Sequence, residues 1–389
     1  MDIKKNLTEI ITESEFDGLL AEKKAPTVKF GADPTAADIH LGHTIILHKL
    51  RQFQEMGAKV IFIIGDFTAR IGDPSGRTKT REPLCPEEIE RNAASYKEQV
   101  FKILDREKTE VLYNSSWLSK MDLAQILKLT SLHTVARMLE RDDFSIRYKE
   151  EKPIAISEFL YPLLQAYDSV VVEADVEIGG SDQKFNLLLG RTIQSAFGKK
   201  PQVVVTMPLL EGTNGKMKMS KSYGNYIGIT EPADSIFGKL MSISDSLMIK
   251  YYRLLTDKDT ERIEEDIKSG ELHPMKVKEE LACHITSLYH GKAEAEEAKL
   301  KFKRLFSHRE ILENDTPVYM IDVPIGIIEI ICQAGLSPTK SEARRLSLQG
   351  AVSIDGEKIR SLDGLISKPG LLKVGKRNFL KVQIHSPSY

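Results

Sequence analysis

The sequence has few cysteines, lacks long apolar runs and carries almost no net charge, and each shortage argues against a class of protein. Cys85, Cys283 and Cys332 lie far apart and lack the spacing of metal ligands, which argues against a disulfide framework or a zinc site. No apolar stretch approaches membrane-spanning length, and residues 1–5 do not resemble a signal peptide. We therefore expect a cytoplasmic protein with reduced cysteines.

The net charge of −1 at pH 7 excludes a uniformly basic coat for nucleic acid, so any RNA contact must come from local patches. The 389 residues suffice for two or three domains with their own cores. Hydrophobic residues make up 41% and charged residues 29%, the balance of an ordinary folded protein.

Residues 27–43 contain the first pattern that points to a ligand. Residues 27–32 predict a buried strand, and a turn at Asp33-Pro34-Thr35 leads to a helix over residues 40–56. Asp38 is the expected N-cap of this helix.

His40 and His43 lie three residues apart, on nearly one side of the first helical turn, and Gly42 between them gives a flat ligand access to the backbone. Helix N-termini favour anions, and neutral imidazoles donate hydrogen bonds to phosphate. The alternative is a helix start with two half-exposed histidines.

Further buried strands are predicted at residues 60–64, 110–113, 170–178 and 202–210, with helices at residues 86–106 and 118–145 in the middle of the chain. Continuous apolar runs such as residues 60–64 are typical of parallel strands covered by helices on both faces. Strand, helix and strand then form right-handed crossovers, with a nucleotide site at the carboxyl ends of the strands.

Two loops follow predicted strands at that edge. Asp73-Pro74-Ser75-Gly76, followed by Arg77 and Arg81, comes after the second strand; ordinary turn chemistry is the alternative explanation. Gly179-Gly180-Ser181-Asp182-Gln183 follows another strand and opens a helix, with Ser181 or Asp182 as its expected cap.

Tyr161, Gln165 and Asp168 have the spacing i, i+4, i+7, which aligns them along one side of a helix. A tyrosine stripe is usually core, but a stripe with an amide and a carboxylate is better explained as the wall of a polar pocket, because burying such groups unpaired is costly.

A loop over residues 216–222 carries Lys218 and Lys221, which can place compact positive charges on phosphate oxygens. A solvated surface loop is the alternative.

From Glu231 to about Thr316 the chain becomes helical and highly charged.

The C-terminal segment is basic. Residues 323–389 hold ten Lys or Arg and five Asp or Glu, a net of +5, so the rest of the chain carries −6. Thr339 and Glu342 predict a capping box for a helix with Lys340, Arg344 and Arg345, and Asp355-Gly356 predicts a hairpin that includes Lys358. This asymmetry points to RNA phosphates; a plain solvated domain is the alternative.

Together these motifs resemble a known family. His40-Leu41-Gly42-His43 is similar to the HIGH signature of class I aminoacyl-tRNA synthetases, and Lys218-Met219-Ser220-Lys221-Ser222 matches their KMSKS signature. The segments around Tyr161, Asp73 and Gly179–Gln183 resemble the tyrosine pocket of bacterial tyrosyl-tRNA synthetases, in the subgroup with an intact KMSKS loop. The tail resembles an S4-type RNA-binding module.

The resemblance implies an α/β fold: a Rossmann-like parallel-sheet catalytic domain with a helical insertion over residues 1–226, a helical anticodon-arm domain over 227–322 and a small α+β S4-like domain over 323–389. It implies ATP, L-tyrosine and tRNA(Tyr) as substrates, Mg²⁺ accompanying ATP without a protein-held metal site, and a homodimer formed through the middle insertion.

The site residues follow from the same resemblance. His40 and Thr35 are expected at the phosphates, Gly42 and His43 at adenosine and Asp182 at ribose. Lys218 and Lys221 should hold pyrophosphate, assisted by Arg77 and Arg81. The tyrosine-binding set comprises Asp33, then Asp73, Tyr161 and Gln165 at the ammonium, Gln183 near the carboxylate and Asp168 at the phenol. Lys340, Arg344, Arg345 and Lys358 are expected to bind RNA.

Lys29 departs from the family pattern. Many members have a tyrosine there that gives the substrate hydroxyl a second partner, and a flexible ammonium cannot replace that fixed phenol. Two alternatives remain open: a tryptophan-specific relative, which Asp168 and Gln165 argue against, and a catalytically silent RNA-binding relative, which the intact His40, His43, Lys218 and Lys221 argue against.

Overall fold

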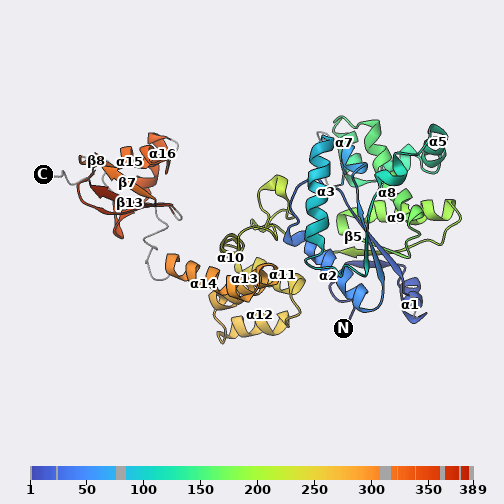
Figure 1. The fold of residues 1–389 in the computed structure, drawn as a ribbon, viewed down its shortest axis with the longest axis horizontal. Coiled ribbons are helices and arrows are strands. Elements are labelled where there is room, and N and C mark those ends of the chain that lie inside the picture. The colour runs from blue at the N-terminus through green and yellow to red at the C-terminus, as the bar shows by residue number, and fades with distance from the viewer. Residues whose placement is uncertain are drawn as a thin grey trace. The chain divides into compact units, whose positions relative to one another are not determined.

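A computed structural model (Figure 1) describes residues 2–22, 25–75, 85–306, 317–321, 323–337, 339–359, 364–375 and 378–384. The chain forms two compact units, Met1–Lys299 and Leu300–Tyr389. Within the described ranges no helix is both long and apolar enough to cross a membrane. Arg77 and Arg81 lie outside the described residues, as does Gly76.

A six-stranded sheet organises the first unit. Its spatial order is β1-β6-β5-β2-β3-β4, and every neighbouring pair is parallel except β1 with β6. The predicted parallel sheet is therefore confirmed, whereas the antiparallel edge strand β1 was not predicted. The strands are β1 (Glu9–Ile11), β2 (Thr27–Ala32), β3 (Lys59–Ile64), β4 (Thr109–Tyr113), β5 (Val176–Gly180) and β6 (Val203–Met207).

Helices connect these strands in the predicted crossover pattern. The helix after β2 is α2 (Leu41–Glu55), and α8 (Ile156–Val171) packs along α9 (Lys184–Ala196). Leu163, Ala166 and Ile193 are among the buried side chains between α8 and α9. The middle of the chain is helical as expected, with α3 (Pro86–Val100), α4 (Ser115–Leu118), α5 (Leu123–Ser131), α6 (Val135–Met138) and α7 (Asp142–Lys149).

The strand predicted over residues 170–178 is wrong in its first half, because α8 continues through Val171 and β5 begins only at Val176. The valines favour a strand locally, but Val170 packs in the hydrophobic cluster beneath α8 and α9, and this tertiary contact outweighs the local preference. Glu173, with φ of +48°, turns the chain between the helix and the strand. The helix predicted over residues 86–106 also ends early, at Val100.

The following segment is helical, as predicted from its charge pattern. It forms α10 (Ala233–Met241), α11 (Asp245–Leu255), α12 (Thr260–Ser269), α13 (Pro274–His290) and α14 (Lys292–Phe306). α10 to α13 belong to the first compact unit. The three-domain division at residues 226/227 and 322/323 stays a prediction.

The described residues of the second unit form a five-stranded sheet in the order β10-β9-β12-β13-β7 and the pair β11-β8. With them lie the end of α14 and the helices α15 (Ile327–Gln333) and α16 (Lys340–Leu348). Thr339 caps α16, accepting a hydrogen bond from the Glu342 N–H at 3.2 Å. Asp355 and Gly356, both with positive φ, form the predicted hairpin between β9 and β10. The remaining strands are β7 (Val318–Ile321), β8 (Ile325–Gly326), β9 (Val352–Ile354), β10 (Glu357–Lys358), β11 (Leu365–Ile366), β12 (Gly370–Val374) and β13 (Asn378–Ile384).

Candidate active site

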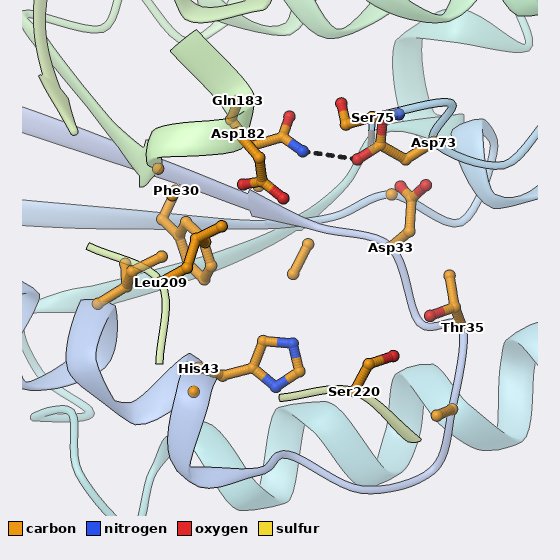
Figure 2. Close-up of a pocket in the computed structure, with 18 of the residues that line it drawn as sticks. Phe30, Asp33, Thr35, His43, Asp73, Ser75, Asp182, Gln183, Leu209 and Ser220 are labelled. Carbon is orange, nitrogen blue, oxygen red and sulfur yellow. Dashed lines mark hydrogen bonds between the residues drawn. The ribbon is translucent and has the colours of Figure 1, made fainter. Parts of the chain in front are cut away.

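A cavity of about 620 Å³ lies at the carboxyl ends of the parallel strands (Figure 2). It brings together thirteen of the residues predicted from the sequence: Asp33, Thr35, His40, Gly42, His43, Asp73, Tyr161, Gln165, Asp168, Asp182, Gln183, Lys218 and Lys221. Lys340, Arg344, Arg345 and Lys358 belong to the second unit, where all four are exposed.

The histidine turn forms one wall of the cavity. His40 is the N-cap of α2, so the prediction of Asp38 as the cap is wrong; Asp38 forms an ion pair instead. The His40 and His43 rings stack with centroids 3.8 Å apart, and His43 Nδ1 accepts a hydrogen bond from the His40 backbone N–H at 3.3 Å. That bond leaves the proton of a neutral His43 on Nε2, free to donate to a ligand. A Cβ on Gly42 would lie 3.0 Å from the His40 ring, so glycine makes this stacking possible.

Both imidazoles are neutral at pH 7. Burial lowers the pKa of His40 well below its usual value, with smaller contributions from His43 and Lys218. Burial and the positive charge of Lys218 lower the pKa of His43 to about 4. Two neutral rings can therefore donate to phosphate or contact a base without competing with the lysines for its charge.

The two loop lysines each form an ion pair with a carboxylate. Lys218 Nζ lies 2.6 Å from Asp182 Oδ2, and Lys221 Nζ lies 3.2 Å from Asp38 Oδ2. Asp182 therefore pairs with a loop lysine, and the N-cap positions at the helix after β5 belong to Gly180 and Gln183, so the prediction of Ser181 or Asp182 as cap is wrong. Lys218 contacts Oδ2 alone, so a ligand hydroxyl at Asp182 can bind Oδ1 or compete with the Lys218 ammonium for Oδ2.

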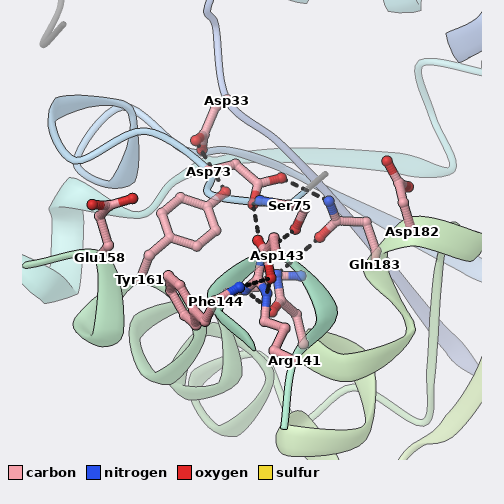
Figure 3. A network of polar contacts seen from close by, with 12 residues as sticks. Asp33, Asp73, Ser75, Arg141, Asp143, Phe144, Glu158, Tyr161, Asp182 and Gln183 are labelled. Atoms are coloured by element: carbon pink, nitrogen blue, oxygen red, sulfur yellow. Dashed lines mark hydrogen bonds and ion pairs between the residues drawn. The ribbon is translucent and has the colours of Figure 1, made fainter. Parts of the chain in front are cut away.

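A hydrogen-bonded network forms the opposite wall (Figure 3). Gln183 Nε2 donates to Asp73 at 2.7 Å, and Asn186 donates both to Gln183 at 3.0 Å and to Gln165 at 2.9 Å. Arg141, which was not predicted, is buried behind this wall and donates to Asn186 and Ser75.

Tyr161 connects that wall to the β2 edge. Its hydroxyl donates to Asp33 at 3.0 Å, and Asp33 also accepts from Thr68 Oγ1 at 2.7 Å. Burial and the charges of Asp33 and Asp73 raise the pKa of Tyr161 well above its usual value, so it stays a neutral donor. A Cβ on Gly65 would lie 2.1 Å from the Asp33 carboxylate, so the glycine after β3 makes room for Asp33.

Asp168 lines the cavity and is 4% exposed. Its carboxylate accepts from Trp117 Nε1 at 2.8 Å and from Asn114 Nδ2 at 3.2 Å. Burial raises the pKa of Asp168 to about 6, opposed by the charge of Lys29 and by these two hydrogen bonds. Asp168 is thus ionised at neutral pH and can accept a further hydrogen bond. Asn114 and Trp117 were missed, although Asn114 directly follows β4 at the carboxyl edge of the sheet and that position could have found it, whereas Trp117 lies on the short helix α4 and carries no such signal.

Lys29 is fully buried, and its Nζ lies 2.8 Å from Glu177 Oε1. The description of Lys29 as a flexible ammonium is therefore wrong. Glu177, which lines the cavity, was also missed. A lysine between Val28 and Phe30 and a glutamate between Val176 and Ile178 each interrupt an apolar strand. Because isolated buried charges are costly, these two interruptions could have predicted a pair.

Comparison with known proteins finds the same family that the sequence motifs resemble. The family model described as tRNA synthetases class I (W and Y) matches residues 21–307. The tyrosine–tRNA ligase of Thermotoga maritima is 51% identical over 385 residues, covering 98% of this chain and 96% of that protein. The tyrosine–tRNA ligase of Geobacter sulfurreducens is 50% identical over 397 residues, covering 98% and 97%. A tyrosyl-tRNA synthetase from Archaeoglobus fulgidus, solved with L-tyrosine, has a TM-score of 0.63 at 26% identity, covering 76% of this chain and 97% of that chain.

Proposed function

The chain belongs to the class I tRNA synthetase family for tryptophan and tyrosine, and we infer that it is a tyrosine–tRNA ligase. The enzyme activates L-tyrosine with ATP to tyrosyl-adenylate and pyrophosphate, then transfers tyrosine to the 3′ end of tRNA(Tyr). The observation that carries this conclusion is a single cavity with neutral imidazoles and lysines at one end and the Asp168 carboxylate at the other.

The tyrosine carboxylate is itself the nucleophile at the α-phosphate, so the reaction needs no covalent enzyme intermediate. Catalysis then depends on positioning and on stabilising the charge that develops on departing pyrophosphate. We assign Thr35 and His40 to the phosphates, and Gly42 and His43 to adenosine. Their common position in the first turn of α2 and the turn before it supports this assignment.

Lys218 and Lys221 supply the positive charge for pyrophosphate, with Arg77 and Arg81 as further candidates. Asp182 accepts from the ribose hydroxyls. Movement of the Lys218 ammonium to the phosphates would leave both Asp182 oxygens to the ribose. Mg²⁺ would arrive with ATP, since magnesium in such sites is held mainly by phosphates and water.

The opposite end of the cavity holds tyrosine. Asp33, Asp73, Tyr161 and Gln165 offer oxygen acceptors for the ammonium group, and Gln183 lies beside Asp73, near the expected position of the carboxylate. Asp168 accepts the hydrogen bond of the phenol. The indole of tryptophan, with its N–H elsewhere, would leave Asp168 without the hydrogen bond from the ligand, which disfavours a tryptophan-specific enzyme.

We assign tRNA binding to the basic second unit. The exposed side chains of Lys340 and Arg344, one turn apart on α16, support this assignment, with Arg345 and Lys358 as further candidates.

We also propose a cytoplasmic homodimer formed through the inserted helices. The exposed apolar side chains of Leu123, Leu127 and Val135 are the observation that supports the dimer.

Exchange of labelled pyrophosphate into ATP tests the activity directly. Tyrosine should support exchange, whereas tryptophan and phenylalanine should support little. Exchange with tryptophan alone would make the protein a tryptophan enzyme, and no exchange with any amino acid would make it a silent RNA-binding relative.

Deletion of residues 323–389 tests the assignment of the second unit. Exchange should continue at the wild-type rate, while tRNA charging should fall and the binding that remains should depend less on salt, because phosphate contacts account for salt dependence. Wild-type tRNA affinity at moderate salt in the truncated protein would contradict the assignment.

A further inference from the structure

The charge pair beneath the tyrosine pocket joins two neighbouring strands of the sheet. Lys29 on β2 and Glu177 on β5 are register partners, and their side chains are 0% and 1% exposed. Lys29 Nζ also donates to the Gln165 carbonyl at 3.0 Å and to Ser169 Oγ at 2.7 Å. These three partners use all three N–H groups of the ammonium, so Lys29 has none to offer a ligand.

Glu177 is equally well satisfied. Its Oε1 accepts from Lys29 and from Gln165 Nε2 at 3.5 Å, and its Oε2 accepts from Ser169 Oγ at 3.0 Å and from Gln202 Nε2. A Cβ on Gly190 of α9 would lie 2.5 Å from Gln202 Nε2 and 3.2 Å from Glu177 Oε2, so glycine at this position makes room for the contact. Groups on α8, on α9 and directly before β6 therefore accommodate this one pair.

Gln165, Asp168 and Ser169 all lie on α8, and the pair holds two of them. We propose, on the basis of the tyrosine-activating function above, that Lys29 and Glu177 are a positioning pair: they fix α8 on the sheet and place one buried positive charge at Ser169, the residue after Asp168, so that the pocket at Asp168 requires a hydroxyl donor. Neither residue touches the phenol in this arrangement.

Several groups around Asp168 decide its charge. Lys29 lowers its pKa, Glu177 raises it, and Trp117 and Asn114 lower it through their hydrogen bonds. Tyr161, whose pKa Asp168 helps to raise, stays neutral. A protonated Asp168 would present its own O–H and lose much of its preference for a ligand hydroxyl. Lys29 therefore maintains specificity at physiological pH without contacting the substrate.

The two members of the pair should have opposite effects. Lys29→Met removes the positive charge, so the pKa of Asp168 should rise above about 6. Glu177→Gln removes a negative charge, so the pKa should fall. If the pair served only to hold the structure together, both variants would loosen the pocket alike. The pKa of Asp168 would then not shift in opposite directions in the two variants.

The test is the ratio of kcat/KM for tyrosine to kcat/KM for phenylalanine in pyrophosphate exchange between pH 5.5 and 8.5. In the wild type this ratio should fall as pH decreases through about 6, because Asp168 takes up a proton there. In Lys29→Met the fall should begin about one pH unit higher, which would roughly halve the ratio at pH 7. In Glu177→Gln the fall should begin at lower pH.

Lys49→Met is the matched control, since Lys49 is also buried but donates to the carbonyls of Ile3 and Lys5. Its pH profile should match that of the wild type. Identical profiles in Lys29→Met and Lys49→Met would overturn the positioning pair and leave the function intact. A wild-type protein that does not activate tyrosine would overturn the function itself.

If Lys29→Met does not fold, the double variant Lys29→Met/Glu177→Gln removes both charges without leaving one unpaired. The effect of Lys29 on the pKa of Asp168 exceeds that of Glu177. The ratio of kcat/KM values should therefore still begin to fall at a higher pH than in the wild type. A fall at or below the wild-type pH would overturn the proposal.

Discussion

The two ends of the cavity are built in opposite ways. At the tyrosine end, Asp168 is 4% exposed and each of its oxygens already accepts a hydrogen bond. At the phosphate end, the side chains of Lys218 and Lys221 are 35% and 46% exposed, and each forms an ion pair with one carboxylate. On the proposed assignment, the tyrosine end is organised before the substrate arrives, whereas the lysines of the phosphate end would exchange their carboxylate partners for phosphates when ATP binds.

The energetic cost of rearrangement differs accordingly. A solvent-exposed ion pair contributes roughly 0–1 kcal/mol, so ATP can separate Lys221 from Asp38 at little cost. Breaking a buried pair such as Lys29 with Glu177 would leave an uncompensated charge and costs about 3–5 kcal/mol. The proposed assignment therefore puts selectivity at the end whose groups are held by buried contacts, and the reaction at the end whose groups are held only by exposed ion pairs.

The largest effect should come from Lys221→Ala. Loss of one donor to the charge developing on pyrophosphate should slow adenylate formation roughly 10²- to 10³-fold, with little change in tyrosine affinity, because the interaction is made mainly in the transition state. Pre-steady-state formation of tyrosyl-adenylate measures this. Lys216→Ala, an exposed lysine of the same loop, is the control and should remain near wild type.

Asp168→Asn should have the next largest effect, at the opposite end. The amide keeps the shape of the carboxylate but weakens the acceptor, so kcat/KM for tyrosine should fall roughly 100-fold, a loss of about 2–3 kcal/mol. Phenylalanine activation should change little. An unchanged ratio between the two amino acids in exchange assays would place the phenol elsewhere in the cavity.

The smallest effect should come from Asp38→Asn. This change frees Lys221 in the enzyme without ATP, so KM for ATP should fall by no more than roughly fivefold, the worth of an exposed pair. KM for tyrosine should not change. A tenfold or larger rise in KM for ATP would mean that Asp38 itself contacts the nucleotide.

Local spacing predicted most of the site. The histidine turn, the Tyr161-Gln165-Asp168 stripe and the lysine loop are short patterns, and the parallel sheet brings their elements to one edge. Patterns of this kind predict the folded arrangement because helix and strand geometry fixes which side chains share a face.

The remaining features depend on contacts between distant segments. Lys29 meets Glu177 only because β2 lies beside β5 in one register, and Trp117 reaches Asp168 only because the insertion folds back against α8. The helix cap was predicted wrongly for a local reason: Asp38 is a good cap by residue type, but α2 begins only at Leu41, so His40 takes the cap position.

A double-mutant cycle tests most directly whether the two ends of the cavity act independently. Lys221→Ala, Asp168→Asn and the double variant are compared by kcat/KM for tyrosine in pyrophosphate exchange. Groups that act independently should give free-energy losses that add within roughly 0.5 kcal/mol. A coupling energy well beyond that value, of either sign, would contradict the separation of tyrosine recognition from phosphate chemistry.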